Sequence, residues 1–182
     1  EKEPTTRSER TWHLDTRAKE AIGRALLSSP GVICYLQCDV FCLREETTTL
    51  NWISRAPCDA VVLAGVLRAN STLTSFNLAP GASLDTKARS EIGYALLNNP
   101  HSCVAFCNDF GLTPSTTTCQ FDLSRSELKE VEPFRLLAGC LRGNRTLTHV
   151  TLRQLRMEQI DTLALALRGN STLAQLDIIH TS

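Results

Sequence analysis

The chain has 182 residues, 42% of them hydrophobic, and its 19 basic and 19 acidic side chains give a formal net charge of zero. This balance argues against nucleic-acid binding, which usually requires a clear excess of Lys and Arg. No apolar run approaches the roughly 20 residues that span a bilayer, and the charged opening EKEPTTRSER is unlike a signal peptide. We therefore expect no nucleic-acid partner and no membrane insertion. Because the sequence does not begin with Met, we expect it to be a piece of a longer chain.

Internal repetition is the strongest signal in the sequence. LDTRAKEAIGRALLSSP at 14–30 returns as LDTKARSEIGYALLNNP at 84–100. VVLAGVLRANSTLTSFNL at 61–78 returns as FRLLAGCLRGNRTLTHVTL at 134–152, and a last copy, LALALRGNSTLAQLDI, covers 163–178. The repetition predicts a charged N-terminal extension and one repeat domain built of two long units and a partial one: 1–13 for the extension, 14–182 for the domain, and 14–83, 84–152 and 153–182 for the units.

Helical spacing opens each long unit. Ala18, Ile22 and Leu26 recur every four residues, which gives one apolar stripe on a helix with Thr16 as its predicted N-cap. The same stripe in the second copy predicts a helix capped by Thr86. The same test predicts further helices over 58–69, 133–143 and 157–169.

Short runs of alternating apolar residues lie between the helices and predict strands. We expect five of these runs to lie side by side in one common sheet: 33–38, 73–78, 103–107, 147–152 and 173–178.

Each long unit contains one more alternating run. Leu50 and Trp52 form it in the first unit, and it recurs from Cys119 in the second. The connections to it, 42–47 and 111–116, are too short for a helical crossover to a parallel neighbour. We therefore expect each long unit to carry an extra strand that returns in a hairpin-like manner.

A recurring phrase joins each of three helices to the next strand. LRANSTL, LRGNRTL and LRGNSTL place Asn70, Asn144 and Asn170 where a predicted helix ends. Asn tolerates the left-handed backbone conformation that terminates many helices, so we interpret these residues as helix caps. Asn-x-Thr is also an N-glycosylation acceptor, and that alternative stays open.

The strand phrase Leu-x-x-Leu-x-Leu at 173–178, together with the preceding LAxxLRxNxTLT phrase, resembles leucine-rich repeats of the ribonuclease-inhibitor-like subclass. The resemblance implies an α/β solenoid in the form of an arc or horseshoe, with parallel strands lining a concave face and helices on the convex side. Because the 70-residue unit is too long for two ordinary repeats, we expect irregular long repeats, each with its extra strand.

Chemistry-bearing residues give weak signals. Cys34, Cys38 and Cys42 have metal-ligand side chains at regular spacing, but their β-branched and aromatic neighbours favour a strand with buried thiols. The sequence has no Cys-x2-Cys pair and no nucleotide-binding Gly loop. We expect no metal, no cofactor and no enzymatic activity. Most of the eight cysteines lie in apolar runs, which favours reduced thiols over disulfides and hence a cytoplasmic location.

In the fold that the resemblance implies, alternate strand residues face the concave side and form a surface for a protein partner. We expect a non-catalytic interaction or scaffold module of a larger leucine-rich-repeat protein. The alternatives are an inhibitor or regulator of a partner enzyme and a structural subunit of a large assembly, in which Trp12 and Trp52 would be outward residues covered by neighbours. The predicted partner-binding residues are Tyr35, Gln37, Ser75, Asn77, His149, Thr151, Gln175 and Asp177.

Overall fold

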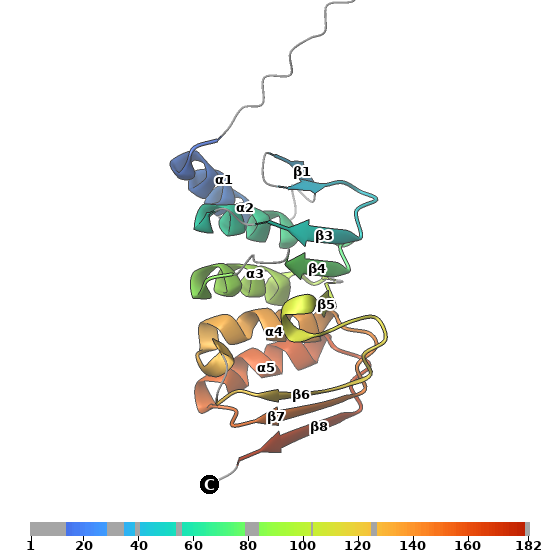
Figure 1. Ribbon diagram of the computed structural model, residues 1–182. Helices are drawn as coiled ribbons and strands as arrows, with labels where there is room; N and C mark the ends of the chain where they lie inside the picture. Colours follow the sequence, from blue (N-terminus) through green and yellow to red (C-terminus); the bar gives the residue numbers. More distant parts are fainter. Residues whose placement is uncertain are drawn as a thin grey trace, which may run out of the picture.

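The computed structural model describes residues 14–28, 35–38, 41–53, 56–78, 84–102, 104–124 and 127–180. Within these residues, five helices are stacked in chain order along one side of the molecule, and short strands run along the other side (Figure 1). The helices are α1 (Thr16–Ser28), α2 (Pro57–Leu67), α3 (Thr86–Asn98), α4 (Val131–Gly143) and α5 (Met157–Gly169), with short 3-10 helices η1 (Asn108–Phe110) and η2 (Glu127–Lys129). The strands are β1 (Leu36–Gln37), β2 (Cys42–Leu43), β3 (Thr49–Trp52), β4 (Ser75–Leu78), β5 (Phe106–Cys107), β6 (Thr118–Asp122), β7 (His149–Arg153) and β8 (Gln175–Ile179).

The described strands form three separate sheets. β1 and β2 pair antiparallel, whereas β3-β4-β5 and β6-β7-β8 are two parallel sheets of three strands each. In each parallel sheet a helix connects one strand to the next: α2 and α3 in the first sheet, and α4 and α5 in the second. Each parallel sheet forms a βαβαβ unit together with its two connecting helices, as expected because parallel strands need long crossover connections.

The predicted leucine-rich-repeat solenoid is wrong. The five predicted strands do not lie in one common sheet, because the described strands are divided among three small sheets. The division follows from the long repeats. β1 pairs backwards with β2, and β5 pairs with β4 over only two residues before the chain turns into η1. Gly111, with φ of 65°, ends η1 in the left-handed conformation and directs the chain away from β5. The fold is α/β with two consecutive βαβαβ units and a two-stranded antiparallel sheet.

The extra strands exist, but their predicted pairing is wrong. β3 and β6 lie where the alternation placed them, yet β3 pairs parallel with β4, and β6 pairs parallel with β7. The short connection correctly excluded a parallel neighbour upstream. It did not exclude a neighbour downstream, which α2 or α4 provides as the crossover helix. The antiparallel hairpin of the first unit is formed by β1 and β2 instead.

The predicted helices are confirmed, with small shifts at their ends, but the predicted N-caps are wrong by one residue. Asp15 and Asp85, not Thr16 and Thr86, cap α1 and α3. The Oδ1 atoms of Asp15 and Asp85 each accept a hydrogen bond of 2.7 Å from the backbone N–H of an Ala three residues later. A carboxylate at this position also complements the positive end of the helix dipole, which explains why it takes the cap.

Glycines allow two pairs of helices to pack closely. A Cβ atom on Gly23 of α1 would lie 2.7 Å from the backbone of Val61 in α2. The copy repeats this contact, since a Cβ on Gly93 of α3 would lie 2.3 Å from the backbone of Arg135 in α4. Such distances leave no room for any side chain. The duplicated sequence therefore produces a duplicated close contact, α1 with α2 and α3 with α4.

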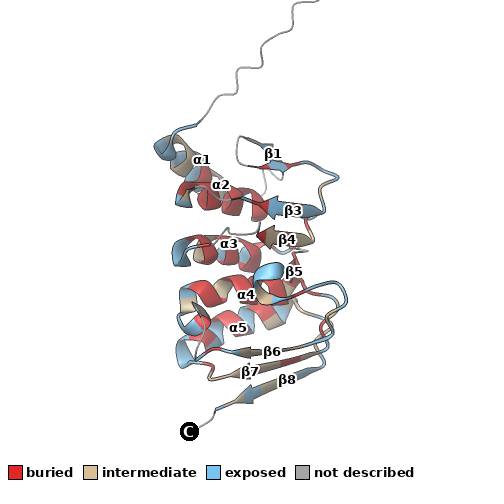
Figure 2. Cartoon of the chain, in the orientation of Figure 1, coloured by how far each residue is buried: buried red, intermediate tan, exposed pale blue. Residues whose placement is uncertain are grey.

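The core lies between the helices and the strands, as the buried residues in Figure 2 show. Trp52 of β3 is fully buried, with its ring centroid 5.8 Å from that of Phe41 and 6.2 Å from that of Phe76. The interpretation of Trp52 as an outward residue is therefore wrong, while Trp12 lies outside the described residues. The strand alternation explains the result, because Leu50 and Trp52 share the inward face of β3.

Candidate protein-binding surface

A row of asparagines fixes the start of the strands that carry the predicted surface. Oδ1 of Asn144 accepts hydrogen bonds from the backbone N–H groups of Thr146 (2.8 Å) and Leu147 (2.6 Å). Oδ1 of Asn170 accepts the equivalent bonds from Thr172 (2.9 Å) and Leu173 (2.8 Å). These bonds hold the turn between each helix and the following strand, and Asn70 makes the same contacts at its turn.

The amide groups of Asn170 and Asn99 join one turn to the preceding one. Nδ2 of Asn170 donates to the carbonyl oxygens of Leu141 (2.7 Å) and Asn144 (3.2 Å). Nδ2 of Asn99 donates in the same way to Leu67 (2.7 Å) and Asn70 (2.6 Å). Asn99 was not singled out from the sequence, although it stands at the corresponding helix end.

The asparagines do follow the helix ends, but the predicted left-handed conformation is wrong. Asn144 has φ −68° and ψ 138°, and Asn170 has φ −90° and ψ 130°, which are extended conformations. Hydrogen bonds from the backbone to the Asn side chain stabilise the turn, which was expected to depend on a left-handed backbone conformation. Asn70 and Asn144 are also buried. A glycan on either amide would require these turns to open, so the folded chain favours the structural interpretation.

Six polar side chains in register form two rows on the outward face of the second parallel sheet, next to a third row of Asp122, Arg153 and Ile179. Pairing between the strands places one row of three across β6, β7 and β8, and a second row two residues further along. Because side chains alternate across a sheet, the intervening Cys119, Val150 and Leu176 point to the core side. We call this set the polar sheet face; its rows are Thr118, His149 and Gln175, and Gln120, Thr151 and Asp177.

A side-chain hydrogen bond connects two strands on the polar sheet face. His149 Nε2 lies 2.8 Å from Asp177 Oδ2, and both side chains are about one-third to two-fifths exposed (33% and 41%). Nε2 of Gln175 donates to both carboxylate oxygens of Asp177, at 3.2 and 3.1 Å. The hydrogen bond from His149, followed by that from Gln175, lowers the pKa of Asp177 below its ordinary value. Asp177 is therefore held as a carboxylate of fixed orientation.

The first parallel sheet carries a smaller polar set. Asn77 Nδ2 donates to Asn51 Oδ1 across β3 and β4 at 3.3 Å, and Ser75 Oγ lies 3.4 Å from Asn77 Oδ1. Ser75 and Asn77 are half-buried. Tyr35 and Gln37 are both exposed. Gln37 lies in β1 of the antiparallel sheet, and Tyr35 lies directly before this strand.

The predicted partner-binding residues are thus spread over three sheets. The structure brings together four of them, two on each of β7 and β8: His149, Thr151, Gln175 and Asp177. Thr118 and Gln120 on β6 belong to the same face and were missed. The alternation of Cys119 and Phe121, which predicted that strand, also contained the signal for its outward residues.

The cysteines are less uniformly buried than predicted. The six described cysteines carry free thiols. Cys42 is exposed and Cys38 half-buried, whereas Cys34 lies outside the described residues. The buried thiols of Cys107 and Cys140 are hydrogen-bonded to each other, which lowers the pKa of Cys107 and raises that of Cys140. Within the described residues, no group of three or more His, Cys, Asp or Glu side chains could hold a metal ion.

No family model matches this sequence, and no curated protein sequence matches it either. In the part of the chain that the structure describes, no helix has the length and apolar character needed to cross a bilayer.

Proposed function

We propose that this chain is a non-catalytic protein-binding module whose partner docks on the polar sheet face. The observation that carries the proposal is the bridge from His149 to Asp177, which is supported by Gln175. These groups are held in position by one another before a partner arrives. A partner that bonds to them then immobilises few additional side chains, and the ordering cost of binding is small.

The support beneath the polar sheet face is rigid. β6, β7 and β8 pair over five successive residues. Val150 and Leu152 anchor the central strand in the core with no exposed surface. Groups on regular paired strands keep their spacing better than groups on loops, which suits a recognition surface.

The chemistry of the face indicates the kind of partner. The face presents carboxylate, imidazole, amide and hydroxyl groups, and the adjacent row adds the guanidinium of Arg153 and one apolar side chain, Ile179. Such a set of groups suits a polar, hydrogen-bonding protein surface better than an apolar helix, which needs a hydrophobic groove. The free buried thiols of Cys58 and Cys140 support a cytoplasmic location, because oxidising compartments favour disulfides.

The test compares two variants that introduce the same side chain. Thr151→Arg places a long cation in the centre of the polar sheet face, and Ser71→Arg places one on the exposed turn after α2. Proteins captured from an extract of the source cells by the unmodified chain are identified, and their binding is measured with purified components. We expect Thr151→Arg to weaken binding more than tenfold, since it buries a charge in the interface, and Ser71→Arg to leave it unchanged. Equal binding by both variants would refute the assignment of this face.

A further inference from the structure

The apolar face of α1 is a copy of a face that is buried in α3. Leu14 and Ile22 are each 37% exposed, whereas their counterparts 70 residues later, Leu84 and Ile92, are 4% and 0% exposed. The same contrast separates Ala25, which is exposed, from its buried counterpart in α3. Identical side chains therefore differ in burial because of their neighbours and not because of their chemistry.

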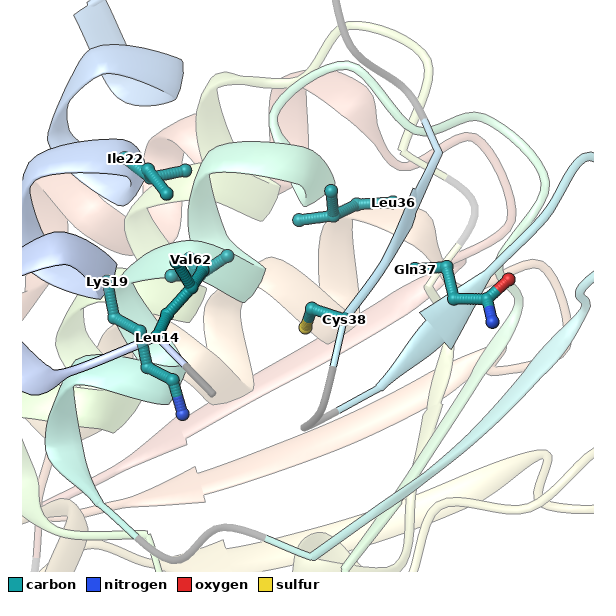
Figure 3. Close-up of a pocket in the computed structure, with 7 residues that line it drawn as sticks. All are labelled: Leu14, Lys19, Ile22, Leu36, Gln37, Cys38 and Val62. Carbon is teal, nitrogen blue, oxygen red and sulfur yellow. The ribbon is translucent and has the colours of Figure 1, made fainter. Parts of the chain in front are cut away.

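The neighbours explain the contrast. α3 packs between α2 and α4, whereas α1 packs on α2 alone among the described helices (Figure 1). The uncovered side of α1 faces a hollow of about 110 Å³ between this helix and the strand β1 (Figure 3). Leu36, Cys38 and Val62 line its inner wall. We call this surface the N face; it consists of Leu14, Ala18, Ile22, Ala25, Leu36 and Cys38.

The opposite end of the molecule exposes a second apolar surface, on α5 and β8. It is a sequence copy of the surface of α2 and β4 that α3 and β5 cover inside the molecule. Ile160 on α5 and Ile178 on β8 are 41% and 47% exposed. Their counterparts 100 residues earlier, Ala60 and Leu78, are 0% and 9% exposed, because α3 and β5 cover α2 and β4. We call this end the C face; it consists of Ile160, Ala164, Leu167, Leu176 and Ile178.

We propose that the C face of one copy of this chain docks on the N face of a second copy. The molecule already contains the contact that this arrangement would reproduce, namely α2 and β4 packed against α3 and β5. The C face is the sequence copy of the first partner, and the N face is the sequence copy of the second. The proposed interface therefore has the same arrangement of helices and strands as a contact that the fold already forms within one chain.

Charge and strand edges favour the same arrangement. α1 carries three basic side chains and one acidic one, whereas α5 carries two acidic and one basic. Among the described strands, β8 pairs only with β7, so its outer edge is open. By the repeat, Gln175 and Leu176 would pair with Gln37 and Cys38 of the second copy, as Ser75 and Phe76 pair with Phe106 and Cys107. A face that binds a different face of the next copy does not close, so the copies form open chains.

The experiment measures the mass of the full chain in solution by sedimentation velocity over a wide range of protein concentration. We expect the average mass to rise with concentration for the unmodified chain. Ile22→Asp removes the N face and Ile178→Asp removes the C face, and each should weaken association more than tenfold, because a carboxylate would enter an apolar interface. Both side chains are partly exposed, so circular dichroism should show that both variants stay folded.

A mixture of the two variants gives the sharpest outcome. Ile22→Asp retains an intact C face, and Ile178→Asp retains an intact N face. We therefore expect the mixture to form a dimer that grows no further, although each variant alone is a monomer. Leu165→Asp is the matched control, since Leu165 is 41% exposed on α5 but lies outside the C face, and it should associate like the unmodified chain.

Three results would overturn the proposal. The first is an unmodified chain that is monomeric at every concentration. The second is a mixture of folded variants that stays monomeric. The third is association that Leu165→Asp disrupts as strongly as Ile22→Asp. If an Asp variant unfolds, Ala25→Glu and Ala164→Glu repeat the pair of tests at exposed alanines of the two faces.

Discussion

Asn170 donates its side-chain amide to the backbone carbonyl of Asn144, 26 residues earlier, at 3.2 Å. The same contact joins Asn99 to Asn70 at 2.6 Å. Asn99, Asn144 and Asn170 thus fix their own turns with the side-chain oxygen and bond the preceding connection between helix and strand with the nitrogen. The amide of Asn70 instead donates to Thr72 in its own turn. The contacts of the side-chain oxygen, which Asn70, Asn144 and Asn170 share, explain why the phrase around them recurs in the sequence.

Replacing Asn144 with Ala should strongly destabilise the chain. Asn144 is fully buried, and its loss leaves the N–H groups of Thr146 and Leu147 and the carbonyl of Ala105 without these bonds. We expect the free energy of unfolding to fall by about 3 kcal/mol, measured by urea denaturation. Asn98→Ala is the control, because its exposed amide donates to the carbonyl of Tyr94 within its own helix. Equal losses in both variants would contradict the role assigned to Asn144.

The carboxyl group of Asp177 should titrate below the ordinary range of Asp. Its pKa is lowered first by the hydrogen bond from His149, so the stabilising contribution is present above the unfolded-state pKa and is lost as the pH falls through the folded-state value. An NMR titration of the carboxyl carbon measures this pKa. In His149→Ala we expect the pKa to rise toward its ordinary value. The same pKa in both proteins would show that the hydrogen bond from His149 has no influence on Asp177.

Gly93→Ala should disrupt the contact between α3 and α4. The new Cβ would lie 2.3 Å from the backbone of Arg135, and backbone cannot move aside cheaply. We expect a loss of about 2–3 kcal/mol in thermal or urea unfolding. Gly169→Ala is the control in α5, where the nearest atoms belong to the side chain of Arg142, which can shift at less cost than backbone, and it should cost clearly less than Gly93→Ala. A neutral Gly93→Ala would mean that the two helices lie further apart.

Trp52 should behave as a core residue in solution. In a Trp12→Phe background, the remaining fluorescence should be blue-shifted and resist quenching by iodide, because Trp52 is fully buried. Trp52→Ala should cost about 4 kcal/mol of stability, and Trp52→Phe considerably less. Efficient quenching in the folded state would instead support the outward position that the sequence had suggested.

Local features of this fold were predictable, and pairing between distant segments was not. Helical spacing located α5 at its observed bounds, and alternation located β3 and β6, because both signals depend only on residues close in sequence. The division into sheets depends on which edges meet after folding. The two-residue length of β5 and the turn at Gly111 decide this, and neither has a periodic signature.

The candidate site was predictable in the same partial way. Alternation, combined with the resemblance to leucine-rich repeats, predicted that His149, Thr151, Gln175 and Asp177 point outward, and the structure places them on adjacent paired strands. It also grouped Tyr35 with them, although Tyr35 lies beside a different sheet. The pairing of His149 with Asp177 required the register between β7 and β8, which the sequence alone does not specify.

The row of asparagines crosses the boundary between the two parallel sheets. Asn144, at the turn before β7, donates to the carbonyl of Ala105, directly before β5, although no strand ladder joins β5 to β6 in the described residues. Unfolding of the first parallel sheet would therefore remove the acceptor of the hydrogen bond that the buried Asn144 amide donates. The stabilities of the two βαβαβ units are therefore coupled, and thermal unfolding should show one cooperative transition instead of two.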